Sequence, residues 1–391
     1  DLPVTVSHAR TGANPLFLER TDIRAAELRG LRETASDQTR VGLALRKRTP
    51  TSNPWLGLLV DGASLRFGYA TASGGTVTSL SDSRGIDAGL AYDRRPGKRD
   101  IDAIPGFLDA ALRTLLPRAL EQSALVRRLL DARLRWTPEQ IAFSTAYSDQ
   151  QGRSFRYDRI LRTDADTAVR PTESLRRWLS ADARIGLRPF ESLTADLSVT
   201  STRDLLPAEK ATLQPREREA IEAARATLAG ADIGWETARS LNGQLAFRPD
   251  LAPWLRPGFT YSARFSTTRT PSNIELVPGP GGDTTAVLQN TFQADRQIAR
   301  TLLFEPAGLV QALLGPRQVG RAGRALLALG RAIQPIDLAW NTSLSSQFDR
   351  ETARPGLRYQ LGLGSFDAFR LVGDDTAAAT LDNASFRARS G

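Results

Sequence analysis

Few side chains in this sequence have the types and spacing that catalysis or metal binding requires. His8 is the only histidine, and the chain contains no cysteine and no methionine. Thiol catalysis, disulfide frameworks and cysteine-type zinc sites are therefore excluded. A lone histidine near the start of the chain favours an ordinary surface residue over a general base. We expect a protein that is not an enzyme.

Two further patterns approach known binding motifs without completing them. Asp164 and Asp166 resemble the opening of a calcium-binding loop, but the required glycine and closing glutamate do not follow. The stretch 278–283 (PGPGGD) lacks the Lys-Ser/Thr of a phosphate-binding loop and is interrupted by prolines, so it favours a flexible turn. No metal ion and no cofactor is predicted.

A carboxylate pair can be drawn across one hairpin, but its neighbours favour a simpler interpretation. Asp182 and Asp196 fall on the polar side of an alternating segment, and Arg184 and Arg188 fall on the same side of it. A solvated wall of mixed charge accounts for all four side chains. No catalytic residue is predicted here.

The hairpin itself is the clearest structural signal in the chain. In residues 179–188 and again in 193–200, an apolar residue occupies almost every odd position. Only an extended strand converts a period of two into two faces. The cluster 189–192 (PFES) between the two halves is typical of a turn. Such a hairpin either covers the core of a soluble sandwich or stands in a membrane with its apolar side toward lipid.

The same alternation recurs through most of the sequence. Further alternating segments are 41–45, 63–69, 86–92, 141–147, 241–247, 259–265, 336–348 and 357–363. The last four predict two more hairpins, 241–265 and 336–363. We count roughly a dozen strands of about 8 to 12 residues, the length that crosses a bilayer at a tilt.

Helical insertions interrupt these strands. They are expected at about 101–133, where Pro117 should break the helix, at 207–230, and at 295–333. Long helical insertions are unusual in a soluble sandwich, whereas a very large barrel has room for them as loops or plugs. Residues 1–391 are therefore expected to form one β-barrel segment with helical loop insertions.

Composition excludes two other classes of protein. No run of about 18 apolar residues exists, because arginines interrupt even the stretch that begins at Val319, so a helical membrane protein is disfavoured. The net charge is +9 and the pI is about 10.5, yet lysine occurs only at Lys47, Lys98 and Lys210. The arginines are scattered among acids, which indicates genome composition rather than a basic patch. No nucleic-acid partner is predicted.

Tryptophan positions add a second membrane signal. Trp136, Trp178, Trp235 and Trp254 each fall near the start of a predicted strand. Aromatic rings with a polar N–H favour the interface between membrane and water, so these four are candidates for an interface girdle. The alternative is that they cap the ends of a soluble core.

A bilayer would assign the two sides of the strands to different environments. An unpaired charge facing lipid at mid-membrane costs about 2 to 4 kcal/mol, so the charged side must face water. The lumen-facing candidates are Asp182, Arg184, Arg188, Asp196 and Arg264. The lipid-facing candidates are Ile185, Leu187, Leu193, Leu197, Val199, Phe259, Tyr261 and Phe265.

Three segments carry a resemblance to a known family. Residues 136–158 (WTPEQIAFSTAYSDQQGRSFRYD), 188–205 (RPFESLTADLSVTSTRDL) and 284–315 resemble segments of the SprA/Sov family, the giant outer-membrane translocon of the type IX secretion system. Leu288 stands where that family has a glycine, and the use of arginine in place of lysine also departs from it.

The resemblance implies a protein-conducting channel in the outer membrane of a diderm bacterium, which exports folded cargo to the cell surface and supports gliding motility. It implies as partners the secreted cargo proteins, a plug, and periplasmic or surface components of the system, besides the lipid bilayer. The family's barrel is far larger than a dozen strands, so this chain is expected to be a segment of it. The alternatives are a smaller outer-membrane porin or assembly barrel, and a soluble extracellular β-sandwich binding module.

Overall fold

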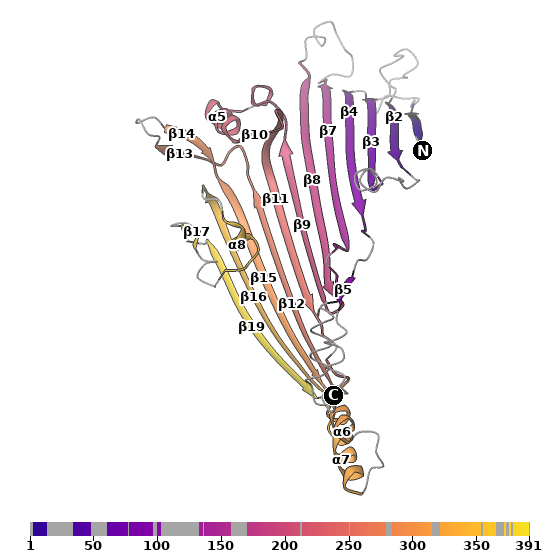
Figure 1. Cartoon of the computed structure of the whole chain (residues 1–391). Coiled ribbons are helices and arrows are strands. Elements are labelled where there is room, and N and C mark those ends of the chain that lie inside the picture. Colours follow the sequence, from indigo (N-terminus) through magenta and orange to yellow (C-terminus); the bar gives the residue numbers. More distant parts are fainter. Residues whose placement is uncertain are drawn as a thin grey trace, which may run out of the picture.

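One long antiparallel sheet dominates the molecule (Figure 1). The computed structural model describes residues 3–13, 34–47, 61–76, 78–96, 100–102, 133–135, 137–157, 170–211, 213–249, 251–278, 284–314, 321–352, 355–364, 371–372, 375–376 and 378–390. The main strands are β1 (Val4–Ala13), β2 (Thr34–Arg46), β3 (Ala63–Gly75), β4 (Ser79–Arg94), β7 (Gln140–Arg156), β8 (Thr172–Phe190), β9 (Leu193–Asp204), β11 (Ala231–Phe247), β12 (Leu255–Thr268), β15 (Asn290–Phe304), β16 (Ile336–Glu351) and β19 (Ala379–Ser390).

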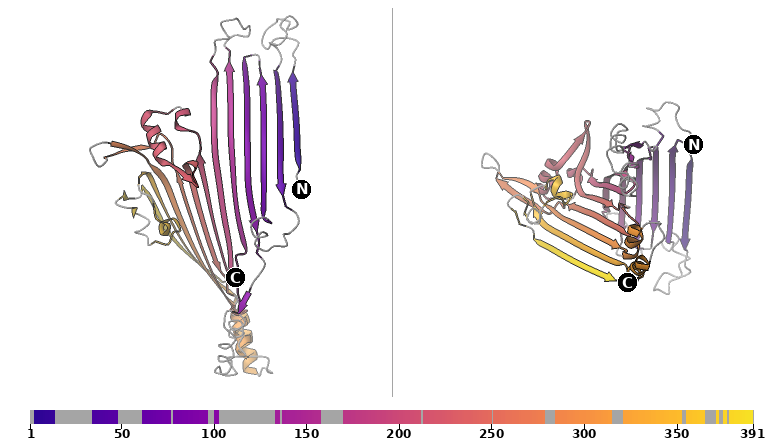
Figure 2. Two further views of the ribbon diagram at one scale, coloured as in Figure 1. Left: turned by 45° about the horizontal axis from the view of Figure 1, so that its top comes forward. Right: turned by 60° about the horizontal axis from the view of Figure 1, so that its bottom comes forward.

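Each main strand pairs with the next main strand along the chain, in the order just given. All of these pairings are antiparallel, which confirms the all-β antiparallel fold expected from the alternation. Among the described strands, β1 and β19 stand at the two edges of this order, so the described sheet is open. Figure 1 and Figure 2 show the strands fanned apart at one end and converging at the other.

The predicted hairpin of 179–200 is the central unit of the sheet. It is formed by β8 and β9, with Ile185 opposite Leu197 and Asp182 opposite Thr200. Strand β8 extends to Phe190, so the turn is tighter than the predicted cluster and comprises residues 191–192. The register shifts between Leu187 and Phe190, which is where a proline without an N–H is tolerated.

Short elements sit between the main strands. They are the strands β5 (Asp100–Asp102), β6 (Arg133–Arg135), β10 (Arg225–Leu228), β13 (Ile274–Pro278), β14 (Thr284–Leu288), β17 (Leu371–Val372) and β18 (Asp375–Thr376), and the helices η3 (Ala208–Lys210), α5 (Pro215–Ala224), α6 (Pro306–Leu314), α7 (Arg321–Ala332) and α8 (Leu357–Gln360). Strand β10 pairs with β11, and β5–β6, β13–β14 and β17–β18 form small ladders. No helix within these described ranges is long and apolar enough to cross a membrane.

The helical insertions differ in detail from the expectation. In 207–230, helix α5 begins with Pro215 behind a capping box of Gln214 and Glu217, but β10 follows it. In 295–333, residues 295–304 are the last ten residues of β15, because Phe292, Ala294 and Ile298 continue the alternation; the helices there are α6 and α7. Of 101–133, residues 103–132 lie outside the described residues.

The predicted hairpin of 336–363 is wrong in its second half. Strand β16 forms as expected, but its partner is β19 rather than a strand at 357–363. Residues 357–360 form the helix α8, where the N–H of Leu361 bonds to the carbonyl of Leu357. Leu357 and Leu361 are also spaced i, i+4, so their pattern fits a helical turn as well as a strand.

Two buried clusters of hydrophobic side chains are present in the described structure. One lies where α8 meets the sheet and contains Leu241, Phe265, Phe292, Ala294, Leu344, Phe348 and Tyr359. The other lies at the fanned end and joins α5 to β11 and β14 through Ala208, Ala220, Ile221, Trp235, Ala286 and Leu288. Both clusters belong to the half of the sheet from β9 to β16, whereas β1 to β8 carry no buried cluster of their own in the described part.

Candidate functional site

The strand register divides the sheet into two faces of different chemistry. Across β7, β8 and β9, Phe143, Ala183 and Val199 stand in one row. The adjacent row holds Ser144, Asp182 and Thr200, whose side chains point to the other side because alternate residues of a strand do so. We name these the apolar face and the polar face.

The apolar face is uncovered over β1 to β8. Its exposed large side chains are Val4, Val6, Val41, Leu45, Leu65, Phe67, Tyr69, Ile86, Leu90, Ile141, Phe143 and Leu187, each at least 36% exposed. Soluble monomers seldom expose so continuous an apolar patch. We name this set the apolar band.

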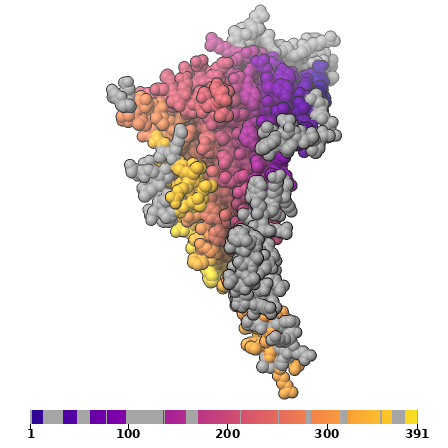
Figure 3. Space-filling view, viewed as in Figure 1, coloured from indigo at the N-terminus to yellow at the C-terminus, as the bar shows by residue number. Residues whose placement is uncertain are grey.

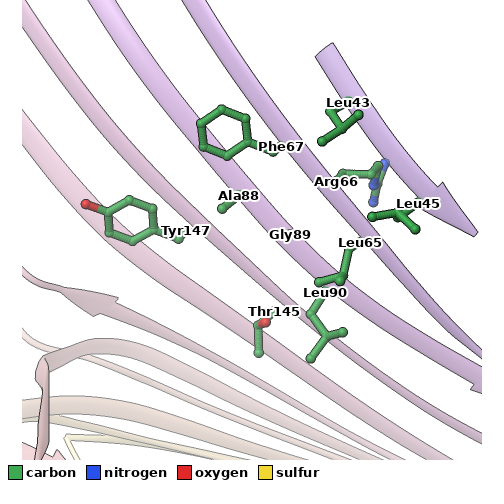
Figure 4. A pocket seen from close by; sticks show the side chains of 10 residues that line it. All are labelled: Leu43, Leu45, Leu65, Arg66, Phe67, Ala88, Gly89, Leu90, Thr145 and Tyr147. Atoms are coloured by element: carbon green, nitrogen blue, oxygen red, sulfur yellow. The ribbon is translucent and has the colours of Figure 1, made fainter. Parts of the chain in front are cut away.

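A shallow depression lies within the apolar band (Figure 4). Its volume is about 410 Å³, and Leu43, Leu65, Phe67, Leu90 and Tyr147 line it together with the small side chain of Ala88. They come from β2, β3, β4 and β7, and the register places them on the same side of the sheet. The small residue leaves space between larger ones, so the band is uneven rather than flat.

The apolar band ends at a consistent height across the strands. Beyond it, the same face carries Thr39 on β2, Thr71 on β3 and Arg84 on β4, which are register partners in that order. On β7 and β8, Asp149 accepts a hydrogen bond of 2.6 Å from Arg177. Toward the fanned end this face is therefore mixed, because it also carries Leu175, which is 38% exposed, and the register pair Leu80 and Phe155.

The height of the apolar band fits a bilayer. On β8 the apolar residues run from Leu179 to Leu187, which is nine residues of strand. A transmembrane strand tilted by about 45° needs about 9 to 11 residues to cross the hydrocarbon core. The strand is longer than this band, as a wall that projects beyond a membrane requires.

The polar face consists of small and hydrogen-bonded side chains. Ser148 donates to Asp87 at 2.6 Å, and Thr200 donates to Asp182 at 2.8 Å. Each carboxylate thus keeps a partner on the neighbouring strand. This network gives the face its mixed charge without burying an unpaired ion among these residues.

A groove of about 770 Å³ runs along the polar face between β8 and β19. Its charged side chains are Arg184, Asp196, Arg264 and Asp295, and serine and amide side chains separate them. Arg184 forms an ion pair of 3.3 Å with Asp196, and Arg264 donates to the side chain of Asn242 at 3.1 Å. The groove is water-accessible and carries both signs of charge.

The structure brings four of the five lumen-facing candidates to one side of the sheet. Asp182, Arg184, Asp196 and Arg264 lie on the polar face by register. Arg188 follows Leu187 at the register shift, and its guanidinium donates to the carbonyl of Glu191 at 3.3 Å. For Asp182, Arg184 and Asp196, and likewise for Arg264, the observed polar side is the side that the alternation predicted. That this side lines a lumen is a proposal.

The eight lipid-facing candidates all lie on the apolar face, but two of them are covered. Phe265 is 2% exposed because Tyr359 of α8 packs edge-on against its ring. The hydroxyl of Tyr261 donates to the carbonyl of Leu361 at 2.5 Å. The prediction that these two side chains face lipid is therefore wrong, and alternation could not show this because the segment that covers them is distant in sequence. Leu197 and Val199 are partly buried against the same cluster, whereas Ile185, Leu187, Leu193 and Phe259 are not buried in the described structure.

The segment 355–364, which contains α8, covers this part of the apolar face. Tyr359 inserts among Phe265, Phe292 and Phe348, and its hydroxyl lies 2.6 Å from Ser346 Oγ. Burial raises the pKa of Tyr359 to about 12, although the hydrogen bond to Ser346 acts in the opposite direction. The hydroxyl is therefore neutral across the physiological range.

Arg296 holds the same segment against the sheet. Arg296 stands on the apolar face of β15 and donates to the carbonyls of Gly362 at 3.2 Å and Gly364 at 2.7 Å. These two carbonyls give the guanidinium acceptors on a face whose neighbouring side chains are mostly apolar. Sequence reasoning missed both the anchor and the segment, since an arginine that breaks the alternation was the only signal.

The four tryptophan candidates lie in four different environments. Trp235 is 2% exposed and packs in the cluster at α5, so it is not available to an interface, and Trp178 lies inside β8 on the polar face beside Arg176. Trp254 precedes β12 and packs edge-on against Phe304 at 6.1 Å. Trp136 lies outside the described residues.

The weaker chemical candidates stay without a site. His8 lies in β1, and its Nδ1 is 3.0 Å from Thr39 Oγ1 on the exposed surface. The described ranges contain no group of three histidine, cysteine or acidic residues that could hold a metal ion. Asp164 and Asp166, and residues 279–283 of the glycine-rich stretch, lie outside those ranges.

The comparisons with known proteins give no family. No protein-family model matches the chain, and no curated protein matches it. The two faces of the sheet are therefore the basis for any functional conclusion.

Proposed function

We propose that this chain forms part of the wall of an outer-membrane β-barrel that conducts proteins, as the resemblance to the SprA/Sov family implies. The apolar band would face lipid and the polar face would line an aqueous channel. Folded cargo would pass this lining on its way to the cell surface, and cargo that includes motility adhesins would link the protein to gliding.

One observation carries this proposal. A continuous apolar band of about bilayer height stands on one face of the long strands β1 to β8, and a hydrogen-bonded polar face stands behind it. A bilayer has no donors or acceptors for strand edges, so the edges β1 and β19 would pair with further strands of a closed wall. The open sheet is what a segment of a very large barrel would look like.

The test places the same charge on opposite faces of one strand. Phe143→Arg puts an arginine in the apolar band, and the matched control Ser144→Arg puts it on the polar face near Asp182, which already accepts from Ser144 at 3.4 Å. The variants are made in the protein as the cell produces it. Membrane fractions are then extracted with carbonate or urea.

Phe143→Arg should reduce the extraction-resistant protein strongly, because an arginine facing lipid costs about 2 to 4 kcal/mol, and Ser144→Arg should leave it near the wild-type amount. Release of the unmodified protein as a soluble, folded molecule would overturn the proposal.

A soluble extracellular β module is the second candidate, and one observation favours it. The segment 355–364 shows that this chain can cover part of its own apolar face without lipid. In such a module the apolar band would need a similar cover. The extraction experiment separates the two candidates, since only the barrel requires a membrane.

A further inference from the structure

A helical hairpin projects from the converging end of the sheet (Figure 1, Figure 3). Helices α6 and α7 form it. They pack closely at Gly330 because glycine has no side chain; a methyl group there would lie 3.0 Å from Val310 Cγ2. Gly323, one heptad before Gly330, is also buried. The glycines thus fix which side of α7 faces α6.

The remaining surface of α7 is amphipathic. Leu326, Leu329 and Ile333 follow helical spacing and are 50%, 61% and 47% exposed. Arg324 and Arg331 are also exposed and, at helical spacing, lie on roughly the opposite side of the helix from this apolar stripe. An exposed leucine stripe with basic residues on the other side is typical of a helix that lies on a membrane surface.

The charge of this region has one sign. Residues 306–336 contain Arg317, Arg321, Arg324 and Arg331 and no acidic residue. The stretch therefore carries positive charge alone. An anionic surface is its complement, because basic residues close to such a membrane each gain about 1 kcal/mol.

The hairpin is continuous with the apolar face of the sheet. Phe304 ends β15 on that face and contacts Trp254, and Gly308 of α6 lies so close to Trp254 that a methyl group would be 2.8 Å from its Cβ. Tryptophan favours the boundary between lipid and water. The hairpin therefore begins where the apolar face meets such a boundary.

We propose that α6–α7 is a membrane-surface anchor, which inserts Leu326, Leu329 and Ile333 between anionic lipid headgroups at the converging end of the sheet. This inference rests on the proposed membrane function. It also assigns the converging end of the strands to a bilayer surface, so the fanned end points away from that surface.

The test uses the absence of cysteine from the chain. Leu329→Cys in the full protein is labelled with an environment-sensitive dye, and the protein is reconstituted into phosphatidylcholine vesicles with or without phosphatidylglycerol. Ala328→Cys, next to it on the exposed arginine side, is the matched control. Lipids that carry a spin label near the headgroup report contact by quenching.

The dye at position 329 should be quenched in the anionic vesicles, while the dye at 328 stays in water. Arg324→Gln and Arg331→Gln should each lower the ratio of inserted to water-exposed dye about fivefold at low salt. Arg216→Gln on α5, at the other end of the sheet, should leave this ratio unchanged.

Two results would overturn the anchor. A dye at 329 that stays in water in both vesicles excludes insertion, and a dye that is shielded but not quenched by lipid shows that a protein covers the stripe. Phe143→Cys, labelled in the same way, distinguishes the two proposals: quenching there with water at 329 rejects the anchor alone, whereas water at both positions also rejects the membrane wall.

Discussion

At the residue scale, Gly362 decides whether the segment 355–364 can seat on the sheet. Its φ is +66°, a conformation that favours glycine, and a methyl group on it would lie 2.8 Å from the hydroxyl of Tyr261. Gly362→Ala should weaken the seating of the segment by about 1 to 3 kcal/mol. Hydrogen exchange of residues 357–363 measures this directly.

A second glycine of the same segment is the control for that substitution. Gly356 has φ −67° and no atom within 4 Å of the position of a methyl group. Gly356→Ala should therefore leave exchange unchanged or slow it slightly, since alanine restricts the unfolded chain. Equal acceleration in both variants would show that the segment is not held as the structure places it.

At the element scale, α8 should leave the sheet at alkaline pH. Tyr359 has a pKa of about 12 in the folded protein against 10.0 for the unperturbed side chain. Because the folded value is the higher one, its neutral hydroxyl stabilises the segment fully below about pH 10, and this contribution is lost as the pH rises through about 12. A dye on the exposed Arg358→Cys should report release over that interval, and Tyr359→Phe should abolish this dependence.

The same element shows what the sequence could and could not predict. Period-two alternation predicted β8, β9, β11 and β12 because half-buried strands convert it into two faces. It failed at 357–363, where a spacing compatible with both strand and helix was resolved by the tertiary contact of Tyr359 with Phe292 and Phe348. Burial of Phe265 and Trp235 likewise depends on segments distant in sequence, which alternation does not contain.

At the scale of the whole molecule, the strand register defines the two candidate faces better than any single residue does. Once one pair such as Ile185 and Leu197 is fixed, antiparallel neighbours place most large apolar residues from β2 to β12 on the same side. The sequence therefore predicted the two faces. It did not predict that the helices of 306–332 project from the converging end of the sheet, because this depends on how the strands fan and converge (Figure 2).

The two faces make a final prediction about what each of them meets in the cell. A photo-crosslinking amino acid at Gln244, in the groove of the polar face, should capture secreted proteins, since cargo would pass that lining. The same amino acid at Phe67, in the apolar band and 49% exposed, should capture lipid instead. Blocking secretion upstream should remove the protein adducts at Gln244 and leave the lipid adducts at Phe67. Lipid adducts at Phe67 without any protein adduct at Gln244 would leave a membrane barrel that does not conduct proteins, because the polar face would then contact only water and small solutes.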